Sequence, residues 1–249
     1  MFDLVSIITP AYNASKFIEQ CVYSVINQSY MNWEMIIVDD CSDTQTKQKI
    51  EELAKLDKRI QPIYLKENVG AAQARNRAIK IAKGRYIAFL DADDYWCRDK
   101  LEKQIAFMQE KDIAFSFTSY QPVSEDGSKE FTIIKAPKKM TYTSYLKNTI
   151  IGCLTVIIDV HQVGCFKMPE IRSSHDMALW LLIMKKGFPA FGLNKNLARY
   201  RIVSTSNTSS KINAMQDVWK VYREIEGLSF FYSCFCFLNY VFNALIKRL

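Results

Sequence analysis

Residues 68–94 read NVGAAQARNRAIKIAKGRYIAFLDADD, and this stretch decides the fold class. The alanine-rich run over residues 70–82 predicts a helix, which Gly84 ends. Residues 86–90 form an apolar strand, and the acidic run 91–94 follows it directly. A helix that leads straight into a buried strand is the repeating unit of a parallel sheet, so the sequence predicts an α/β fold.

The same alternation continues on both sides of that stretch. Further strands are predicted at residues 5–8, 35–38, 60–65, 113–120 and 154–158. Further helices are predicted at residues 15–26, 43–56, 100–111, 140–148 and 177–186. We expect Pro10 to end the first strand. Because no repeat or linker is evident, residues 1–211 are predicted to form one domain around a mostly parallel open sheet with flanking helices, and residues 212–249 one long helix.

Composition and charge narrow the class of protein. The chain has 249 residues, 49% of them hydrophobic and 24% charged, which excludes collagen-like and wholly disordered proteins. Its net charge is +7, and residues 195–249, with 8 basic and 3 acidic side chains, contribute +5 of it. This basic end predicts an anionic partner such as a membrane surface, whereas the excess is too small to indicate nucleic acid.

Cysteine and histidine usage indicates an intracellular protein. The seven cysteines include no CxxC pair, which argues against a disulfide framework and a thiolate zinc site. The two histidines, His161 and His175, are too few for a His-rich metal site. The amino terminus, MFDLVSIITP, lacks the basic region of a secretory signal. We therefore expect a protein that stays in the reducing interior of the cell.

Polar residues gather where the predicted strands end, at residues 9–13, 39–40, 68–70 and 91–94. The carboxyl ends of parallel strands meet at the edge where open α/β sheets bind ligands. TPAYN follows the first strand in place of GxGxxG, and no GK[ST] string occurs. The sequence therefore indicates neither a dinucleotide-binding fold nor a P-loop.

The acidic run after the fourth strand is a candidate metal site. Asp91 and Asp93 project to the same side of an extended chain, with the small Ala92 between them. Two such carboxylates repel each other, which raises a pKa or recruits a cation. One interpretation is a Mg²⁺ or Mn²⁺ ion that also binds a diphosphate. The other is a solvated acidic turn that caps the next helix.

Three further positions allow two interpretations each. Asp39 ends a strand, where its carboxylate could accept the imino N–H of a uracil or cap the helix that follows. Arg75, one turn into the helix at residues 70–82, could bind a nucleotide or pair with a carboxylate. Asp176 stands at a predicted helix start, so it could act as a general base or cap the helix.

Together, these strings resemble the family 2 inverting glycosyltransferases of the GT-A fold, especially bacterial enzymes that build surface polysaccharides. The resemblance runs over residues 4–211, through VSIITPAYN, VDD, the stretch at 68–94, HDMALWLLIMKKG and YRIVSTSNTSSK. It implies a Rossmann-like nucleotide-binding half and an acceptor-side region. The implied reaction transfers a single sugar from a nucleotide-sugar, with UDP preferred, to a hydroxyl of a glycan or polyprenyl-linked acceptor. The implied cofactor is Mn²⁺ or Mg²⁺, and the implied process is the synthesis of O-antigen, capsule or another surface polysaccharide.

The resemblance also implies a role for each matching position. Asp176 would be the catalytic base, and Asp93 would bind the metal ion, with Asp91 as a second candidate ligand. Asp39 would bind the uracil. The residues against the nucleotide-sugar would be Thr9, Ala11, Tyr12, Asp39, Asn68, Arg75, Asp91, Ala92 and Arg201. The polar run at residues 204–210 resembles a segment that folds over the donor, although an ordinary connector has a similar composition.

Two departures from the family pattern bear on function. His175 precedes the base where the family usually has Glu, which puts the contacts to the acceptor in doubt. The chain lacks the QxxRW string of processive members, which favours addition of one sugar per encounter. Two other classes stay open. A sugar nucleotidyltransferase would normally have a Gly- and Lys/Arg-rich loop after its first strand, and an inactive membrane-anchored binding subunit would need no catalytic base.

Residues 228–246 form a 19-residue stretch without a formal charge, rich in Phe and Tyr and flanked by basic residues. Ser229, Ser233, Asn239 and Asn243 interrupt it and fall partly on one side of a helix. We favour an amphipathic helix in the membrane surface, with packing on a partner or on its own domain and a membrane span as alternatives. The protein is therefore expected to be cytoplasmic and peripheral on the inner face of the cell membrane.

Overall fold

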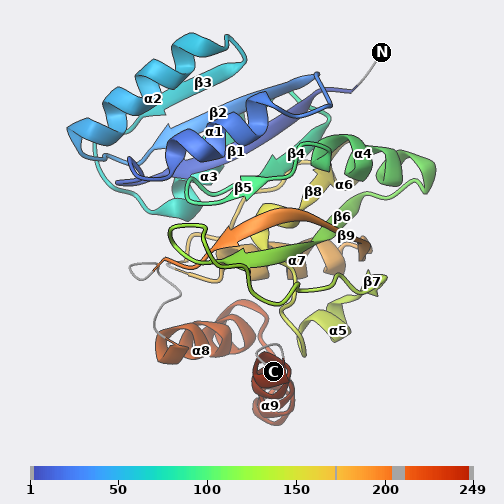
Figure 1. The fold of residues 1–249 in the computed structure, drawn as a ribbon. Helices are drawn as coiled ribbons and strands as arrows, with labels where there is room; N and C mark the ends of the chain where they lie inside the picture. Colours follow the sequence, from blue (N-terminus) through green and yellow to red (C-terminus); the bar gives the residue numbers. More distant parts are fainter. Residues whose placement is uncertain (1–2, 172, 204–210, 247–249) are drawn as a thin grey trace.

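The computed structural model describes residues 3–171, 173–203 and 211–246. In these ranges nine strands form one mixed sheet in the order β3-β2-β1-β4-β8-β6-β9-β5, with β7 paired to β9. Helices flank the sheet, and the two carboxyl-terminal helices lie together at the end of the molecule farthest from α2 (Figure 1). The run predicted to fold over the donor, residues 204–210, lies outside the described residues.

The amino-terminal half confirms the predicted parallel sheet. Its strands β1–β4 pair in parallel in the order β3-β2-β1-β4 and alternate with α1, α2 and α3. The bounds are β1 Val5–Ala11, α1 Ile18–Ile26, β2 Trp33–Asp39, α2 Thr44–Leu56, β3 Ile60–Tyr64, α3 Ala71–Ile81 and β4 Tyr86–Phe89. Pro10 does not end β1, because its pairing with Val38 and that of Ala11 with Asp39 continue the ladder. A single proline removes only one donor.

The carboxyl-terminal half makes the sheet mixed. β8 runs antiparallel to both β4 and β6, whereas β6 and β9 pair in parallel. The sequence did not predict the long strand β9, which brings Arg201 to the edge where β4 ends. The bounds are β5 Tyr95–Trp96, α4 Lys100–Glu110, β6 Phe115–Val123, β7 Lys139–Met140, η1 Cys153–Thr155, β8 Ile157–Asp159, α6 Val160–Val163, α7 His175–Lys185 and β9 Ala190–Arg201.

Two predicted helices are wrong in extent. The helix predicted over residues 140–148 is only the four-residue α5, Tyr142–Tyr145. The single helix predicted from residue 212 is two, α8 Lys211–Lys220 and α9 Phe230–Ile246, joined by the π-helical turn Val221–Ile225. Gly227 adopts a φ of +62° between them, a conformation that ends helices and that glycine adopts without a steric penalty. No helix in the described ranges combines the length and apolarity needed to cross a membrane.

Two apolar clusters cover the two faces of the sheet. Successive residues of β1 alternate between them, so that Ile7 belongs to one cluster and Ile8 to the other. Helix α7 lies in the cluster of Ile8, and its Trp180 is fully buried with ring centroids 5.4 Å from Phe89 and 5.3 Å from Phe115. This packing fixes α7 against the sheet and thereby positions its first turn, which holds His175 and Asp176.

Candidate active site

The carboxyl ends of β1 and β2 form one side of the site. Asp39, paired with Ala11, is fully buried, and its Oδ2 accepts a hydrogen bond from the backbone N–H of Ser42 at 3.3 Å. Its Oδ1 has no hydrogen-bond partner among the described residues, and the same holds for Oγ1 of the buried Thr9. Unpaired buried oxygens are costly. They are therefore suitable acceptors for N–H groups of a ligand. Tyr12, in contrast, is 56% exposed.

Asp40 has a separate role that the sequence did not reveal. Its two carboxylate oxygens accept hydrogen bonds from the backbone N–H groups of Val69 and Gly70, each at 2.8 Å. Its backbone carbonyl accepts another from Nδ2 of Asn68 at 3.2 Å. Asp40 thus holds the loop that begins α3, and α3 positions Arg75. The sequence could not reveal this role, because the partners of Asp40 lie about 30 residues further along the chain.

Arg75 links the acidic run to the first turn of α7. The guanidinium is buried, with Nη2 donating to Oδ1 of Asp91 and Nη1 to Nε2 of His175. Burial by itself would lower the pKa of Arg75, but the charge of Asp91 and, less strongly, that of Asp176 oppose this, and the pKa is raised. The two carboxylates predicted for donor binding and for catalysis therefore act on the same cation.

His175 is held as a neutral acceptor. Burial, and then the charge of Arg75, lower the pKa of His175 below its usual value of 6.5. Because Nε2 accepts from Arg75, the ring proton of the neutral form resides on Nδ1. The backbone of Ile171 also interacts with this ring and partly opposes the lowering of its pKa. The position at which the chain departs from the family pattern thus supplies a hydrogen bond to Arg75.

The acidic run is fastened to the end of β9. Oδ1 of Asp94 accepts the backbone N–H of Arg201 at 2.8 Å, and the Arg201 side chain donates to the carbonyls of Asp93 and Glu125 at 2.8 and 2.6 Å. Arg201 is 3% exposed. These bonds position the loop after β4; contact between Arg201 and the donor stays a prediction. The sequence did not distinguish the buried Asp94 from its neighbours, yet its side chain, like the carbonyl of Asp93, binds Arg201.

Asp93 is the candidate metal ligand of this run. Burial, and then the charge of Asp91, raise the pKa of Asp93 to about 6. Asp91 is engaged by Arg75. Across the described ranges no group of three or more His, Cys, Asp or Glu residues could hold a metal ion. Mg²⁺ or Mn²⁺ is commonly held by one or two carboxylates together with substrate phosphates and waters, so a hard oxygen donor such as Asp93 fits such an ion.

Asp176 faces a small pocket, and its charge acts on Arg75, the partner of Asp91. It lies in the first turn of α7, is partly exposed, and lines a pocket of about 180 Å³. Ser174, with a φ of +56°, takes the N-cap position of α7, so Asp176 is not the N-cap residue, although an acid in the first turn also interacts favourably with the helix dipole. An ionised carboxylate that faces a polar pocket beside a donor site can accept a proton from a hydroxyl bound there.

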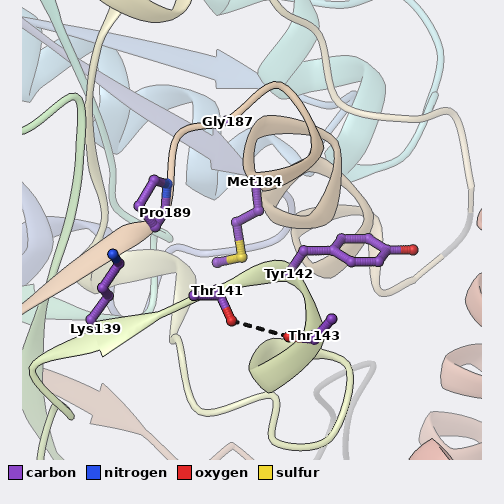
Figure 2. A pocket seen from close by; sticks show the side chains of 7 residues that line it. All are labelled: Lys139, Thr141, Tyr142, Thr143, Met184, Gly187 and Pro189. Atoms are coloured by element: carbon purple, nitrogen blue, oxygen red, sulfur yellow. Dashed lines mark hydrogen bonds between the residues drawn. The ribbon is translucent and has the colours of Figure 1, made fainter.

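Another pocket, of about 310 Å³, lies elsewhere. Figure 2 shows that it is lined from β7, α5 and the loop after α7, with Met184 and Pro189 among its lining residues. Met184 is near the end of α7, whereas Asp176 is in its first turn. None of the residues that line it belongs to the predicted site. We therefore assign the site to the sheet edge at Asp39, Arg75, Asp91 and Asp93 and to the pocket at Asp176.

Comparison with known protein families gives matches over most of the chain. The sequence model of glycosyl transferase family 2 matches residues 6–167. The chain is 53% identical over 246 residues to "Putative teichuronic acid biosynthesis glycosyltransferase TuaG" of Bacillus subtilis (strain 168), covering 99% of this chain and 98% of that protein. It is 39% identical over 251 residues to "UDP-Glc:alpha-D-GlcNAc-diphosphoundecaprenol beta-1,3-glucosyltransferase WfaP" of Escherichia coli, covering 99% and 96%.

Solved structures share the fold. TarS 1-349 of S. aureus, crystallised in complex with UDP-GlcNAc, superposes with a TM-score of 0.69 at 22% identity over 89% of this chain. The mannosyltransferase PcManGT of Pyrobaculum calidifontis, in complex with GDP-Man and Mn²⁺, gives 0.70 at 17% identity over 90%. This chain spans 65% and 64% of those two chains. The likeness confirms the predicted fold class.

Proposed function

The chain belongs to glycosyl transferase family 2, and on that premise we propose that it transfers one glucose from UDP-glucose to a sugar linked to undecaprenyl diphosphate. The product would enter a bacterial cell-surface polysaccharide. Two kinds of relative support this choice. WfgD and WfaP of Escherichia coli are named UDP-Glc:alpha-D-GlcNAc-diphosphoundecaprenol beta-1,3-glucosyltransferases, and TuaG of Bacillus subtilis is named for teichuronic acid biosynthesis.

The observation on which the proposal chiefly rests is the position of Arg75. It touches Asp91 on the donor side and His175, the neighbour of Asp176, on the acceptor side. A transferase must hold the leaving diphosphate and the attacking hydroxyl on one reacting carbon. A buried cation between the two carboxylates supports such a two-sided site.

The reaction then follows from the residues present. Oδ1 of Asp39, which has no hydrogen-bond partner among the described residues, accepts a hydrogen bond from the imino N–H of the uracil. Asp176 takes the proton of the acceptor hydroxyl while that oxygen forms a bond to the anomeric carbon. The bond from this carbon to the UDP oxygen breaks on the opposite face, and UDP leaves with the electron pair, so the configuration inverts. Asp93, with Asp91 as second candidate ligand, would hold Mn²⁺ or Mg²⁺, which when bound stabilises charge on the departing diphosphate.

Helix α9 supports attachment to the inner face of an anionic membrane. Phe231, Phe235, Leu238 and Phe242 recur at spacings of four, three and four, which places them on one helical face. Their exposed fractions are 85, 49, 69 and 63%. A stripe of this kind, next to a sequence end with a charge excess of +5, is typical of helices that lie in the membrane interface. An acceptor on a lipid would be reached from that position.

The decisive experiment distinguishes the role of Asp176 from that of Asp93. We expect Asp176→Asn to retain UDP-glucose binding and lose transfer to a GlcNAc-diphosphate lipid, and Asp93→Asn to lose the gain in UDP-glucose affinity that Mn²⁺ provides. Asp112→Asn is the control, because this exposed residue belongs neither to the candidate site nor to the pocket at Asp176 and asparagine tolerates its φ of +49°. Full transfer by either site variant would refute the assignment. Release of pyrophosphate from UTP would indicate a nucleotidyltransferase instead.

A further inference from the structure

We propose that the two carboxyl-terminal helices complete the acceptor site and that Asp217 of α8 is an acceptor-binding residue that sets its sugar specificity. This inference rests on the proposed function, since it needs Asp176 to act on an acceptor. It concerns a part of the chain beyond the region that the family model matches, residues 6–167.

The pocket that contains Asp176 is built from distant parts of the chain. Its polar lining includes Thr149, Ser173, Ser174, Asp176, Asp217 and Tyr240. Asp176 belongs to α7, Asp217 to α8 and Tyr240 to α9. Its volume of about 180 Å³ is below the roughly 300–1,000 Å³ typical of sites for drug-sized ligands. A pocket of this size and polarity suits one sugar ring rather than a chain of them.

The chemistry of Asp217 suits a sugar hydroxyl. Its Oδ2 accepts a hydrogen bond from Oγ of Ser173, two residues before His175. An ionised carboxylate has about four lone-pair sites, so one such bond leaves acceptor capacity on both oxygens. Hydroxyl donors of a sugar in the pocket would meet Asp176 from one element and Asp217 from another. Only the hydroxyl at Asp176 reacts, and the contact at Asp217 would therefore determine which hydroxyl that is.

Helices α8 and α9, which form one wall of the pocket, are held in place by contacts within the chain. Glu226, after α8, has a side chain only 3% exposed, and its Oε2 pairs with Nζ of Lys185 on α7 and accepts from the Tyr142 hydroxyl of α5, each at 2.5 Å. On α9, Nδ2 of Asn243 donates to the carbonyl of Lys147 at 3.1 Å. These contacts fix the turn after α8 against α5 and α7, and α9 against the segment just after α5, so Asp217 is held at the pocket before an acceptor arrives.

Helix α9 contributes both to the pocket and to the outer surface. Tyr240 of α9 lines the pocket, whereas the stripe of Phe231, Phe235, Leu238 and Phe242 on this helix is exposed. Figure 1 shows α8 and α9 together at one end of the molecule. A lipid-linked sugar would therefore reach the pocket beside the helix whose exposed stripe is apolar, and α9 would serve both contacts.

The test measures binding of an α-D-GlcNAc diphosphate that bears an undecyl chain, by calorimetry with UDP and Mn²⁺ present. We expect Asp217→Asn and Asp217→Ala to weaken its binding about 10- to 100-fold, as loss of a hydrogen bond to a charged group would. UDP-glucose affinity of each variant is the reference. Asp217→Asn retains an oxygen that can accept from Ser173, which keeps the local fold intact. Gln216→Ala, at the exposed neighbour, is the matched control.

The outcomes separate this inference from the proposed function. If the wild-type protein neither binds nor hydrolyses UDP-glucose, the proposed function fails. If it hydrolyses UDP-glucose but does not bind the probe, or if Asp217→Ala binds the probe like the wild type, only the role of Asp217 is wrong. Equal losses of UDP-glucose and probe affinity in both variants would assign Asp217 a structural role and would also overturn the inference.

Discussion

Arg75 of α3 donates a hydrogen bond to His175 of α7, a residue 100 positions away in the chain. The bond joins α3 of the amino-terminal half to the helix that holds Asp176, the proposed base, and it requires an imidazole with an unprotonated Nε2. Arg75 also holds Asp91, so the same guanidinium orients a donor-side carboxylate. Where the family resemblance leads one to expect a glutamate, this chain therefore uses a neutral acceptor whose hydrogen bond depends on pH.

The first prediction concerns pH. The folded-state pKa of His175 is below 6.5, so between that lowered pKa and 6.5 this residue binds more protons in the unfolded chain than in the folded one. The contribution of His175 to the free energy of unfolding therefore falls as the pH falls through this window, and activity falls with it because a protonated imidazole cannot accept from Arg75. His175→Gln keeps an acceptor that does not titrate. We expect this variant to be less sensitive to acid in both unfolding and UDP-glucose turnover.

Asp93 complicates this measurement, because its pKa of about 6 lies near the same window. The informative quantity is therefore the difference between the pH profiles of the wild type and of His175→Gln, both of which contain Asp93. A second variant, His175→Leu, would leave Nη1 of Arg75 buried without its partner, and we expect it to lose about 1–3 kcal/mol of stability. Identical pH profiles for the wild type and His175→Gln would show that His175 does not titrate in the site.

The second prediction concerns Asp40. Asp40→Ala removes two charge-assisted hydrogen bonds to the backbone of Val69 and Gly70, so we expect a loss of about 2–4 kcal/mol in the free energy of unfolding. Urea unfolding measures this loss. UDP affinity should fall as well, because the loop begins the helix that holds Arg75. Asp43→Ala removes only an exposed N-cap of α2, so it should lower the free energy of unfolding by about 1 kcal/mol and leave the affinity for UDP unchanged. Equal UDP affinities for both variants would contradict the positioning role of Asp40.

The third prediction separates two roles of Arg201. If Arg201 fastens the acidic run, Arg201→Lys should lower the melting temperature and the Mn²⁺-dependent affinity for UDP together, because lysine cannot donate to two carbonyls in the same planar geometry. We expect a stability loss of about 3 kcal/mol, comparable to that on breaking a buried charged network. Arg77→Ala, at an exposed position of α3, is the control. An unchanged melting temperature with weakened UDP binding would show that Arg201 acts by touching the donor.

The fold could be predicted where one local pattern determines one element. Strands β1, β2 and β4 are short buried runs next to amphipathic helices, and their hydrophobic periodicity was sufficient. Strand β9 was missed because its middle, GLNKN at residues 192–196, is largely polar, and its pairing with β6 contains register shifts. The break between α8 and α9 was missed because the apolar pattern continues across it and Gly227 is a single residue.

The site could be predicted only in part, for a related reason. The strand-end carboxylates Asp39, Asp91 and Asp93 stand out because the end of a strand is visible in the sequence. The roles of Asp40 and Asp94 depend on backbone groups 29 to 107 residues away, and adjacent aspartates look alike without them. The interaction of His175 with Arg75 is equally invisible, since it joins two helices that the sheet brings together.

The last prediction tests the exposed stripe of α9. Phe231→Ser combined with Leu238→Ser removes two side chains that are 85 and 69% exposed and therefore contribute little to the folded core. We expect the wild-type protein to co-sediment with vesicles that contain phosphatidylglycerol and the double variant to bind at least tenfold more weakly, since burial of one such side chain contributes about 1.5–3 kcal/mol. Tyr23→Ser, which changes an aromatic residue of α1 that is 42% exposed, should bind like the wild type. Hydrolysis of UDP-glucose in solution should survive in both variants, because the donor residues lie on other elements. Co-sedimentation of the double variant at the wild-type level would exclude this stripe as the membrane contact.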